Sequence, residues 1–403
     1  MCNDVIITGL GLITALGKGV GKNLEALIAS RSGIVPLALF ASNHEVVVGE
    51  VTLSNAQMAD ILFLAQDKVY SRTTLFGLLA AKEAYDDAGF STLSIKERSA
   101  LKIGLISATS VGGMDVSENF YKEYRLDKSK GKLRDLLGHD CGASTEKIAD
   151  YLKADDFVST VSTACSSANN AIMLGARMIK HGMLDVVVAG GTDSLSRFTV
   201  NGFHSLGILD KTWCRPFDDT RAGLNLGEGA GYVVLQRADL DHGKVYGKIC
   251  GYANANDAFH QTASSSHGEG AYLAMSGAIE SSGLKPGDIS YVNAHGTGTP
   301  NNDSSEGAAL RRIFGNELPP FSSTKGYTGH TLAAAGGVES VFSLLSLKHG
   351  YIWPNLHFNT PMSEVDAIPV NNLISNCKIN FVLENSFGFG GNCTTLIYGS
   401  YND

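Results

Sequence analysis

The sequence predicts a layered α/β fold, and two observations carry this prediction. Short runs of β-branched residues, which are typical of buried strands, begin at Val5, Ile103, Asp185, Tyr232 and Thr395. Helical stretches lie between these runs, at residues 71–87, 166–181 and 331–349. Because strands that alternate with helices form sheets covered by helices, an α/β architecture follows.

Each predicted element has its own local signal along the chain. VIITGL is the first strand, and the first helix ends before Gly89, since glycine readily terminates a helix. IGLIS is the next strand, and the helix that follows Cys165 ends before Gly182. DVVVAG and YVVLQ are further strands, and the helix that ends before Gly350 precedes the last strand, TLIYG.

Two pairs of similar segments indicate an internal duplication. KIGLISATSVGG resembles DISYVNAHGTGTP, and the helices after Cys165 and His330 both end in KHG. Strand-then-glycine units are common in α/β proteins, so these similarities alone leave a chance resemblance open. We expect an N-terminal half over residues 1–240, a C-terminal half over residues 241–403 and a boundary near Asp241.

Composition excludes several classes of protein. The sequence is 44% apolar and 18% charged, without a Pro- or Ser-rich linker, which fits a large packed core. A net charge of −8 argues against a nucleic-acid partner. The seven cysteines show no CxxC spacing, so we expect neither a disulfide framework nor a bound metal. With no secretory signal and no apolar run of bilayer length, we expect a cytoplasmic protein without a membrane partner.

Cys165, in the segment DFVSTVSTACSSANNAIMLGARMIKHG, is the candidate nucleophile. A β-rich strand gives way there to a helix of small residues, as in a nucleophile elbow. The helix N-terminus lowers the pKa of a nearby thiol, so we expect a reactive thiolate. An inert buried cysteine is the alternative. The small Ser and Ala neighbours leave room for a substrate and favour the nucleophile.

Two histidines and a lysine lie in unusual Gly- and Thr-rich segments. His295 lies in NAHGTGTP, and His330 lies with Lys325 in STKGYTGHTLAAAG. Both segments follow strand patterns, where α/β proteins place ligand sites. Each histidine taken singly could be structural. Together with Cys165, the group indicates nucleophilic acyl chemistry, in which two imidazole N–H groups can meet the charge of an enolate.

Four motifs resemble those of a known family: TACSSA, NAHGTGTP, SSTKGYTGH and NSFGFGG. With TGLG, VAGGTDS and CRPFDDTRAGLNLGEGAGYVVL they occur in the order found in the β-ketoacyl-ACP synthases, and the chain resembles the elongating, synthase II type over nearly its whole length. The resemblance implies the thiolase fold. In that fold two duplicated α/β halves, each with a five-stranded sheet, pack as an αβαβα sandwich and assemble as a dimer.

The resemblance also implies roles for single residues. Cys165 would accept the acyl group, and its amide with that of Phe389 would form the oxyanion hole. His295 and His330 would assist malonyl decarboxylation and stabilise the enolate. Lys325, paired with Glu339, would polarise the site, and Glu306 matches a further acidic position. Thr297 and Thr299 would bind the phosphopantetheine arm, and Val111 would line the acyl pocket. A mobile gate would consist of Phe387, Gly388, Phe389 and Gly390. A plain turn is the alternative for the gate and for the threonines.

The chain departs from the family pattern in two regions. The gate motif reads GFGGNC where relatives have GFGGTN, which places Asn392 and Cys393 at the last two positions; we expect Cys393 to be a small core residue. Residues 114–151 do not match the usual dimer-loop pattern beside the acyl tunnel. An acidic carrier protein would need a local cationic patch, for which the candidates are Lys68, Arg72 and Lys211.

The predicted function is that of a 3-oxoacyl-[acyl-carrier-protein] synthase. The acyl group on Cys165 would condense with malonyl-ACP with loss of CO2, and the only cofactor chemistry is the 4'-phosphopantetheine of the carrier. Expected partners are acyl carrier protein and either an identical subunit or a homologous one. The alternative is a specialised ketosynthase of a polyene or polyketide system, paired with a chain-length factor. A non-catalytic chain-length factor and a CoA-dependent thiolase fit less well, since the cysteine, both histidines and the lysine are present.

Overall fold

The computed structural model describes residues 4–65, 68–240 and 243–401. Its described residues form one 11-stranded mixed sheet in the order β11-β10-β12-β13-β9-β1-β8-β7-β5-β6, with β2 (Gly17–Lys18) paired to β1. A small second sheet joins β3 (Ile34–Pro36) to β4 (Val47–Gly49). The two five-stranded sheets that the resemblance implies are therefore continuous here, because Ile6 and Ile7 of β1 pair with Lys248 and Gly247 of β9.

The two halves of the large sheet repeat one strand order. The N-terminal half runs β6 (Phe157–Val161), β5 (Ile103–Ala108), β7 (Val186–Asp193), β8 (Gly229–Arg237), β1 (Val5–Thr14). The C-terminal half runs β11 (Phe321–Ser322), β10 (Tyr291–Asn293), β12 (Phe381–Phe387), β13 (Asn392–Gly399), β9 (Gly247–Asn256). In both halves, the first three strands in this order run parallel to one another. The fourth strand then pairs antiparallel with both the third and the fifth. The duplication is confirmed. The exact division at residues 240 and 241 stays a prediction, and Asp241 lies outside the described residues.

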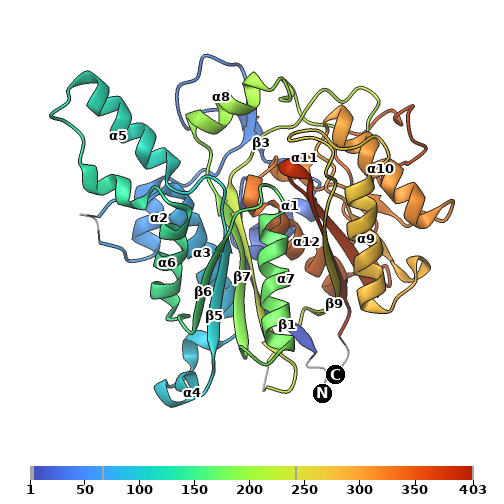
Figure 1. Cartoon of the computed structure of the whole chain (residues 1–403), viewed down its shortest axis with the longest axis horizontal. Helices are drawn as coiled ribbons and strands as arrows, with labels where there is room; N and C mark the ends of the chain where they lie inside the picture. Colours follow the sequence, from blue (N-terminus) through green and yellow to red (C-terminus); the bar gives the residue numbers. More distant parts are fainter. Residues whose placement is uncertain (1–3, 66–67, 241–242, 402–403) are drawn as a thin grey trace.

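Helices cover both faces of each half (Figure 1). The outer layers hold α3 (Arg72–Asp87) and α6 (Cys141–Leu152) on one side, α9 (Glu269–Ser282) and α10 (Pro300–Phe314) on the other, and α7 (Ser167–Lys180) and α12 (Ala335–His349) lie between the halves. Alternate residues of a strand point to opposite faces. Thus Val187 and Ala189 of β7 join the central core, whereas Val186 and Val188 join the outer one. The predicted αβαβα layering is confirmed.

The predicted helices differ from the structure mainly at one end. Ser71 caps α3, with its Oγ accepting from the Thr74 amide, and Ser166 precedes α7, as the sequence indicates. The third helix begins at Ala335 rather than at residue 331. Leu332 has a φ of 55°, in the left-handed region, which no α-helix contains. A 3₁₀ turn (Leu332–Ala334) therefore precedes the helix.

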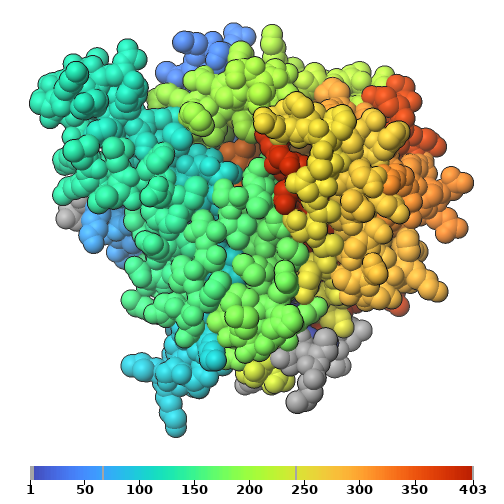
Figure 2. All heavy atoms as spheres, viewed as in Figure 1, coloured from blue at the N-terminus to red at the C-terminus, as the bar shows by residue number. Residues whose placement is uncertain are grey.

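An arm projects from the N-terminal half beside the sheet (Figures 1 and 2). It consists of α5 (Met114–Leu126), none of whose residues is buried, and a 3₁₀ segment (Leu133–Gly138). Large apolar side chains on this arm are exposed: Tyr121, Leu126, Leu133 and Leu137. The remaining helices are α1 (Val20–Ile28), α2 (Asn55–Ile61), α4 (Ile95–Ser99), α8 (Arg197–Ser205) and α11 (Lys325–Thr328). Within the described ranges, no helix is long and apolar enough to span a bilayer.

Candidate active site

Cys165 lies where the chain turns from strand β6 into helix α7. Ala164, just before it, has a φ of 54°, a conformation that a residue with a side chain rarely adopts, so the turn is tight. The Ser166 Oγ donates to the Thr163 carbonyl at 2.7 Å, and the Ser386 Oγ donates to the Cys165 carbonyl at 3.0 Å. These bonds hold the turn so that the thiol meets a cavity at the start of the helix.

The thiol of Cys165 is not acidified by this position. The residue is 6% exposed, and burial raises the pKa of its thiol to about 11. The Lys325 ammonium and the Phe389 amide both lower this pKa, but they do not offset the loss of hydration. The buried carboxyls of Asp193 and Glu339 raise it further. The sequence-based prediction of a lowered thiol pKa is therefore wrong, because it considered the helix terminus and not the burial.

His330 lines the cavity with a defined tautomer. Its Nδ1 accepts a hydrogen bond from the Leu332 amide at 3.2 Å, so the ring proton lies on Nε2. Burial and the charge of Lys325 hold the pKa of the imidazole well below its usual range. The ring is neutral and can donate one hydrogen bond from Nε2.

His295 is held in the same tautomer by Lys325. Lys325 Nζ donates to the His295 carbonyl at 2.6 Å and lies 3.3 Å from its Nδ1, and it pairs with Glu339 Oε1 at 2.5 Å. An ammonium can only donate, so Nδ1 accepts and Nε2 carries the proton. Burial, Lys325 and His330 all hold the pKa of His295 well below its usual range. The centroids of the two imidazole rings lie 5.4 Å apart, and the ring planes are nearly perpendicular, at 84°.

Two buried carboxyl groups hold the loop that carries His295. Glu306 accepts from the His295 amide at 2.9 Å and from the next amide at 2.8 Å, and burial raises the pKa of this carboxyl to about 7. Asp303 accepts from the Thr297 amide at 3.0 Å. The Thr297 and Thr299 hydroxyls, 2.8 Å apart, bond to each other.

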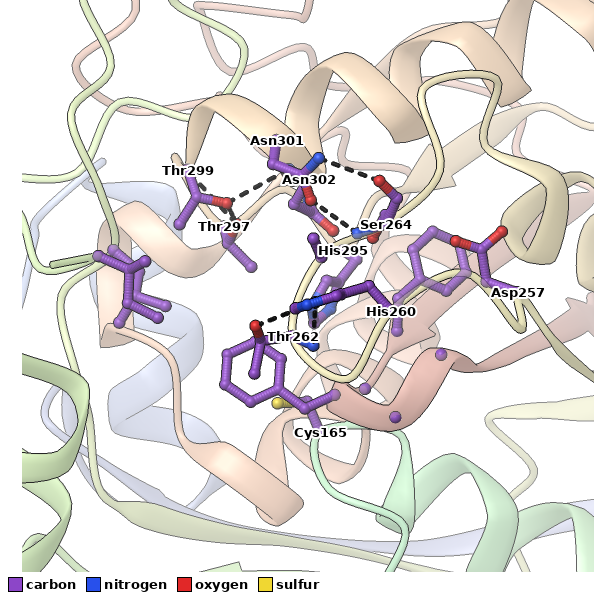
Figure 3. Close-up of a pocket in the computed structure, with 18 of the residues that line it drawn as sticks. Cys165, Asp257, His260, Thr262, Ser264, His295, Thr297, Thr299, Asn301 and Asn302 are labelled. Atoms are coloured by element: carbon purple, nitrogen blue, oxygen red, sulfur yellow. Dashed lines mark hydrogen bonds between the residues drawn. The ribbon is translucent and has the colours of Figure 1, made fainter. Parts of the chain in front are cut away.

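A cavity of about 360 Å³ unites most of the predicted residues. Cys165, His295 and His330 line it, and Thr297 and Thr299 lie on the opposite side from Cys165 (Figure 3). Figure 2 shows a hollow between the green and yellow surfaces, with red atoms from the C-terminal part of the chain inside it. Lys325 and Glu339 do not line the cavity; they contact it through His295.

The loop after β12 forms one wall of the cavity. The Phe389 ring stacks on that of Phe203 in α8, with centroids 5.9 Å apart. Gly390 has a φ of 82°, and its amide donates to the Gln261 carbonyl at 2.7 Å. A Cβ on Gly388 would lie 3.1 Å from the Cys165 amide nitrogen and 2.7 Å from a neighbouring carbonyl oxygen, so only glycine fits there. The movement of this loop as a gate stays a prediction.

Sequence reasoning missed the loop that covers the cavity. Residues 257 and 260–264 line it, together with Phe203, Ile208 and Leu224. Asn301 fixes this loop, since its Oδ1 accepts from the Ser264 amide at 2.7 Å and its Nδ2 donates to the Ser264 carbonyl at 3.0 Å. The His-containing, Ser-rich string DAFHQTASSS was the available signal. In the part of the chain that the structure describes, no cluster of three or more acidic, His or Cys side chains could hold a metal ion.

Val111 and Arg72 do not line the cavity. Val111 belongs to an apolar cluster that includes Leu224, a residue that does line the cavity; the role of Val111 in the acyl pocket stays a prediction. Arg72 is wrong as a carrier-binding residue. It is 3% exposed and pairs with Glu228 at 2.6 Å. Lys68 and Lys211 are exposed and stay candidates.

The altered end of the gate motif builds a hydrogen-bond cluster. Asn392 Oδ1 accepts from Asn170 Nδ2 at 2.9 Å and from Asn254 Nδ2 at 2.8 Å, and it lies 2.7 Å from Ser166 Oγ. The residue therefore links the gate loop to the first turn of α7. Cys393 is buried in the C-terminal core cluster, and burial raises the pKa of its thiol, as expected of a core residue.

Two family models together match almost the entire chain. Residues 2–240 match the beta-ketoacyl synthase N-terminal domain and residues 246–359 the beta-ketoacyl synthase C-terminal domain. The chain is 32% identical over 412 residues to the 3-oxoacyl-[acyl-carrier-protein] synthase 2 of Staphylococcus aureus (strain COL), with 98% of each chain covered. It is 32% identical over 411 residues to the synthase of the same name from Synechocystis sp., again with 98% of each covered.

Solved structures resemble the chain over its full length. The ishigamide ketosynthase/chain length factor has a TM-score of 0.90 at 26% identity and 100% coverage of both chains. A ketosynthase in complex with its chain length factor, from Xenorhabdus doucetiae, has a TM-score of 0.87 at 30% identity, covering 99% of this chain and 98% of that one. Fold and site define a thiolase-fold enzyme with a buried cysteine that shares one cavity with two neutral histidines. The chain belongs to the β-ketoacyl synthase family.

Proposed function

We propose that this chain is a 3-oxoacyl-[acyl-carrier-protein] synthase whose nucleophile is Cys165. The observation that carries the proposal is the single cavity shared by Cys165, His295 and His330 in a chain 32% identical to synthases of that name. In the first step, the Cys165 sulfur attacks the acyl thioester on the carrier. The thioester bond to the carrier breaks, the thiol proton passes to the departing pantetheine sulfur, and acyl-Cys165 forms.

The second step makes the carbon–carbon bond. Malonyl-ACP loses CO2, and the resulting enolate carbon attacks the acyl-Cys165 carbonyl, which releases the Cys165 thiolate and leaves 3-oxoacyl-ACP. A proton taken up from water then restores the thiol. The Nε2–H groups of His295 and His330 donate to the enolate oxygen while its charge develops. Because both rings are neutral and Lys325 with Glu339 fixes the tautomer of His295, these donors require no reorganisation. The thiol nucleophile, the two imidazole donors and the loss of CO2 account for the whole condensation, so the reaction needs no redox group.

The surrounding residues receive supporting roles. The Phe389 amide, which donates to the thiol at rest, would move its bond to the tetrahedral oxyanion together with the Cys165 amide. Thr297 and Thr299 line the far side of the cavity and can donate to the amide carbonyls of the phosphopantetheine arm. The Phe389 side chain would separate the malonyl and acyl ends of the cavity.

We propose acyl carrier protein as the substrate carrier and a second, related subunit as the structural partner. The exposed apolar side chains of the α5 arm support an assembly, since Leu126 and Leu137 are 83% and 80% exposed. The similarity to a ketosynthase that binds a chain length factor supports a heterodimer as the alternative to a homodimer. Free thiols at the six described cysteines fit a reducing cytoplasm.

Two variants test the chemistry separately. Cys165→Ala should abolish acyl transfer and retain some release of CO2 from malonyl-ACP, because the histidines are intact. His330→Gln should slow CO2 release by about 10²- to 10³-fold, the usual cost of losing one such donor. His181→Gln, at an exposed histidine beyond α7, is the matched control. Condensation by Cys165→Ala, or normal CO2 release by His330→Gln, would refute the assignment.

A further inference from the structure

Glu384 is a fully buried carboxyl group that the proposed mechanism does not use. It lies on strand β12 and is 0% exposed. Its Oε1 accepts from Asn169 Nδ2 at 3.1 Å and its Oε2 from Ser340 Oγ at 2.9 Å. Asn169 lies one helical turn after Cys165 in α7, and Ser340 follows Glu339 in α12. One carboxyl therefore joins the nucleophile helix, the helix of the Lys325 counter-ion and the strand that leads into the gate.

No ion pair to Glu384 occurs among the described residues, and the nearby charges do not favour its ionisation. Lys325 is already paired with Glu339 at 2.5 Å. Burial and the negative charge of Glu339 raise the pKa of Glu384 well above its usual range, and Lys325 opposes them without compensating. Tyr398 of β13 is the other titratable group beside it, and burial keeps that phenol protonated by raising its pKa. An uncompensated carboxylate here would be costly, so the group retains its proton.

The hydrogen-bond partners accommodate a proton on Glu384. The Tyr398 hydroxyl lies 2.6 Å from Ser340 Oγ, and both hydroxyls can reverse their direction. In the neutral form, Glu384 Oε2–H donates to Ser340 Oγ, while Oε1 still accepts from Asn169. Glu306 differs, because it accepts hydrogen bonds from three donors: two backbone amides and the Asn385 side-chain amide.

We propose that Glu384 is a positioning residue, a neutral carboxylic acid that holds α7 and α12 against β12 and leaves Glu339 as the sole counter-ion of Lys325. This inference rests on the proposed condensing function for its catalytic consequence, but not for its protonation state. Replacement by glutamine preserves both hydrogen bonds, since its carbonyl accepts from Asn169 and its amide donates to Ser340. The same replacement at Glu306 would turn an amide N–H toward other donors.

The test compares urea unfolding of wild type and Glu384→Gln at pH 6, 7 and 8. A carboxyl whose pKa is raised on folding stabilises the protein fully at low pH and loses that contribution as pH rises toward the folded-state pKa. The unfolding constant of wild type should therefore increase relative to Glu384→Gln by up to about tenfold per pH unit. A ratio independent of pH would overturn the proposal. Infrared difference spectra provide a second check, since wild type at pH 7 should show a protonated-carboxyl band that Glu384→Gln lacks; no such band would also overturn it.

Activity separates positioning from mere packing. Glu384→Ala should lower kcat at least tenfold, and Glu384→Gln should restore most of that loss, whereas Glu306→Gln should lower kcat and stability together. Equal loss in Glu384→Ala and Glu384→Gln would refute the neutral-acid role. If wild type itself condenses no substrate, the proposed function fails, and the unfolding and infrared measurements still decide the state of Glu384.

Discussion

The reactivity of Cys165 should rise steeply with pH and remain low at neutrality. Burial raises the pKa of this thiol to about 11 from an ordinary value of 9.0. Because the thiol pKa is about two units higher, Cys165 carries about a hundredfold less thiolate than an exposed cysteine at any pH below 9. At pH 7, about one Cys165 side chain in ten thousand is a thiolate. Because the thiolate is the form that reacts with alkylating agents, Cys165 of the resting enzyme should be alkylated slowly at neutral pH.

The assay is alkylation by iodoacetamide between pH 6 and 10, followed by mass spectrometry of the peptide that contains Cys165. The rate should increase about tenfold per pH unit without levelling off below pH 9. Lys325→Met should make it slower still, since the ammonium is the main group that lowers the thiol pKa. Lys348→Met, at an exposed lysine near the end of α12, is the control and should match wild type.

A rate that levels off near pH 7 would refute this reasoning. It would mean that a thiolate–imidazolium pair forms at rest, which requires a protonated His295 or His330. Burial and the charge of Lys325 hold the pKa of both imidazoles well below their usual range, so the structure disfavours that pair. Acyl transfer then depends on substrate binding, when the thioester accepts the sulfur electrons as the proton leaves.

Substitutions at four further residues test the framework of the site. Arg72→Met leaves the Glu228 carboxylate buried without its partner and should cost about 3–5 kcal/mol in urea unfolding; an unchanged stability with a weaker carrier affinity would instead restore Arg72 as a docking residue. Glu306→Ala leaves two buried amides unsatisfied at about 1–3 kcal/mol each, and wild-type stability would contradict the hydrogen bonds described. Gly390→Ala should lower the free energy of unfolding by only about 1 kcal/mol, since its Cβ meets no atom within 4 Å and only the positive φ is strained. Gly388→Ala should lower it more and also slow acyl transfer. Equal effects of the two variants would exclude the close packing of Gly388 against the turn at Cys165.

Local patterns predicted the parts of the site that depend on neighbours in sequence. The strand-to-helix turn at Cys165 and the glycine-rich loops at His295 and His330 are visible as strings, because each needs small residues and sharp turns. The pairing of Lys325 with Glu339 came only from a family resemblance. Its geometry depends on how α11 packs against α12, which no local pattern records.

Burial accounts for the predictions that failed. Arg72 follows a serine cap at the start of a helix, where an exposed arginine would look the same in sequence. Only the packing of α3 against Glu228 shows that its charge is already neutralised. The same holds for the thiol pKa of Cys165, since a helix terminus can be read from sequence and the depth of the cavity cannot.

By itself, the sequence predicted the fold class, indicated the internal duplication and singled out Cys165, His295 and His330 as candidate site residues, because strand alternation, glycine turns and motif strings can be read directly along the chain. Only the tertiary structure decided how much water each group retains. It revealed a protonated thiol, two neutral imidazoles with a defined tautomer, and a buried carboxyl at Glu384 that the sequence did not single out. The physical reason is that a pKa depends on hydration and on charges from distant segments, and both are set when the two halves pack together.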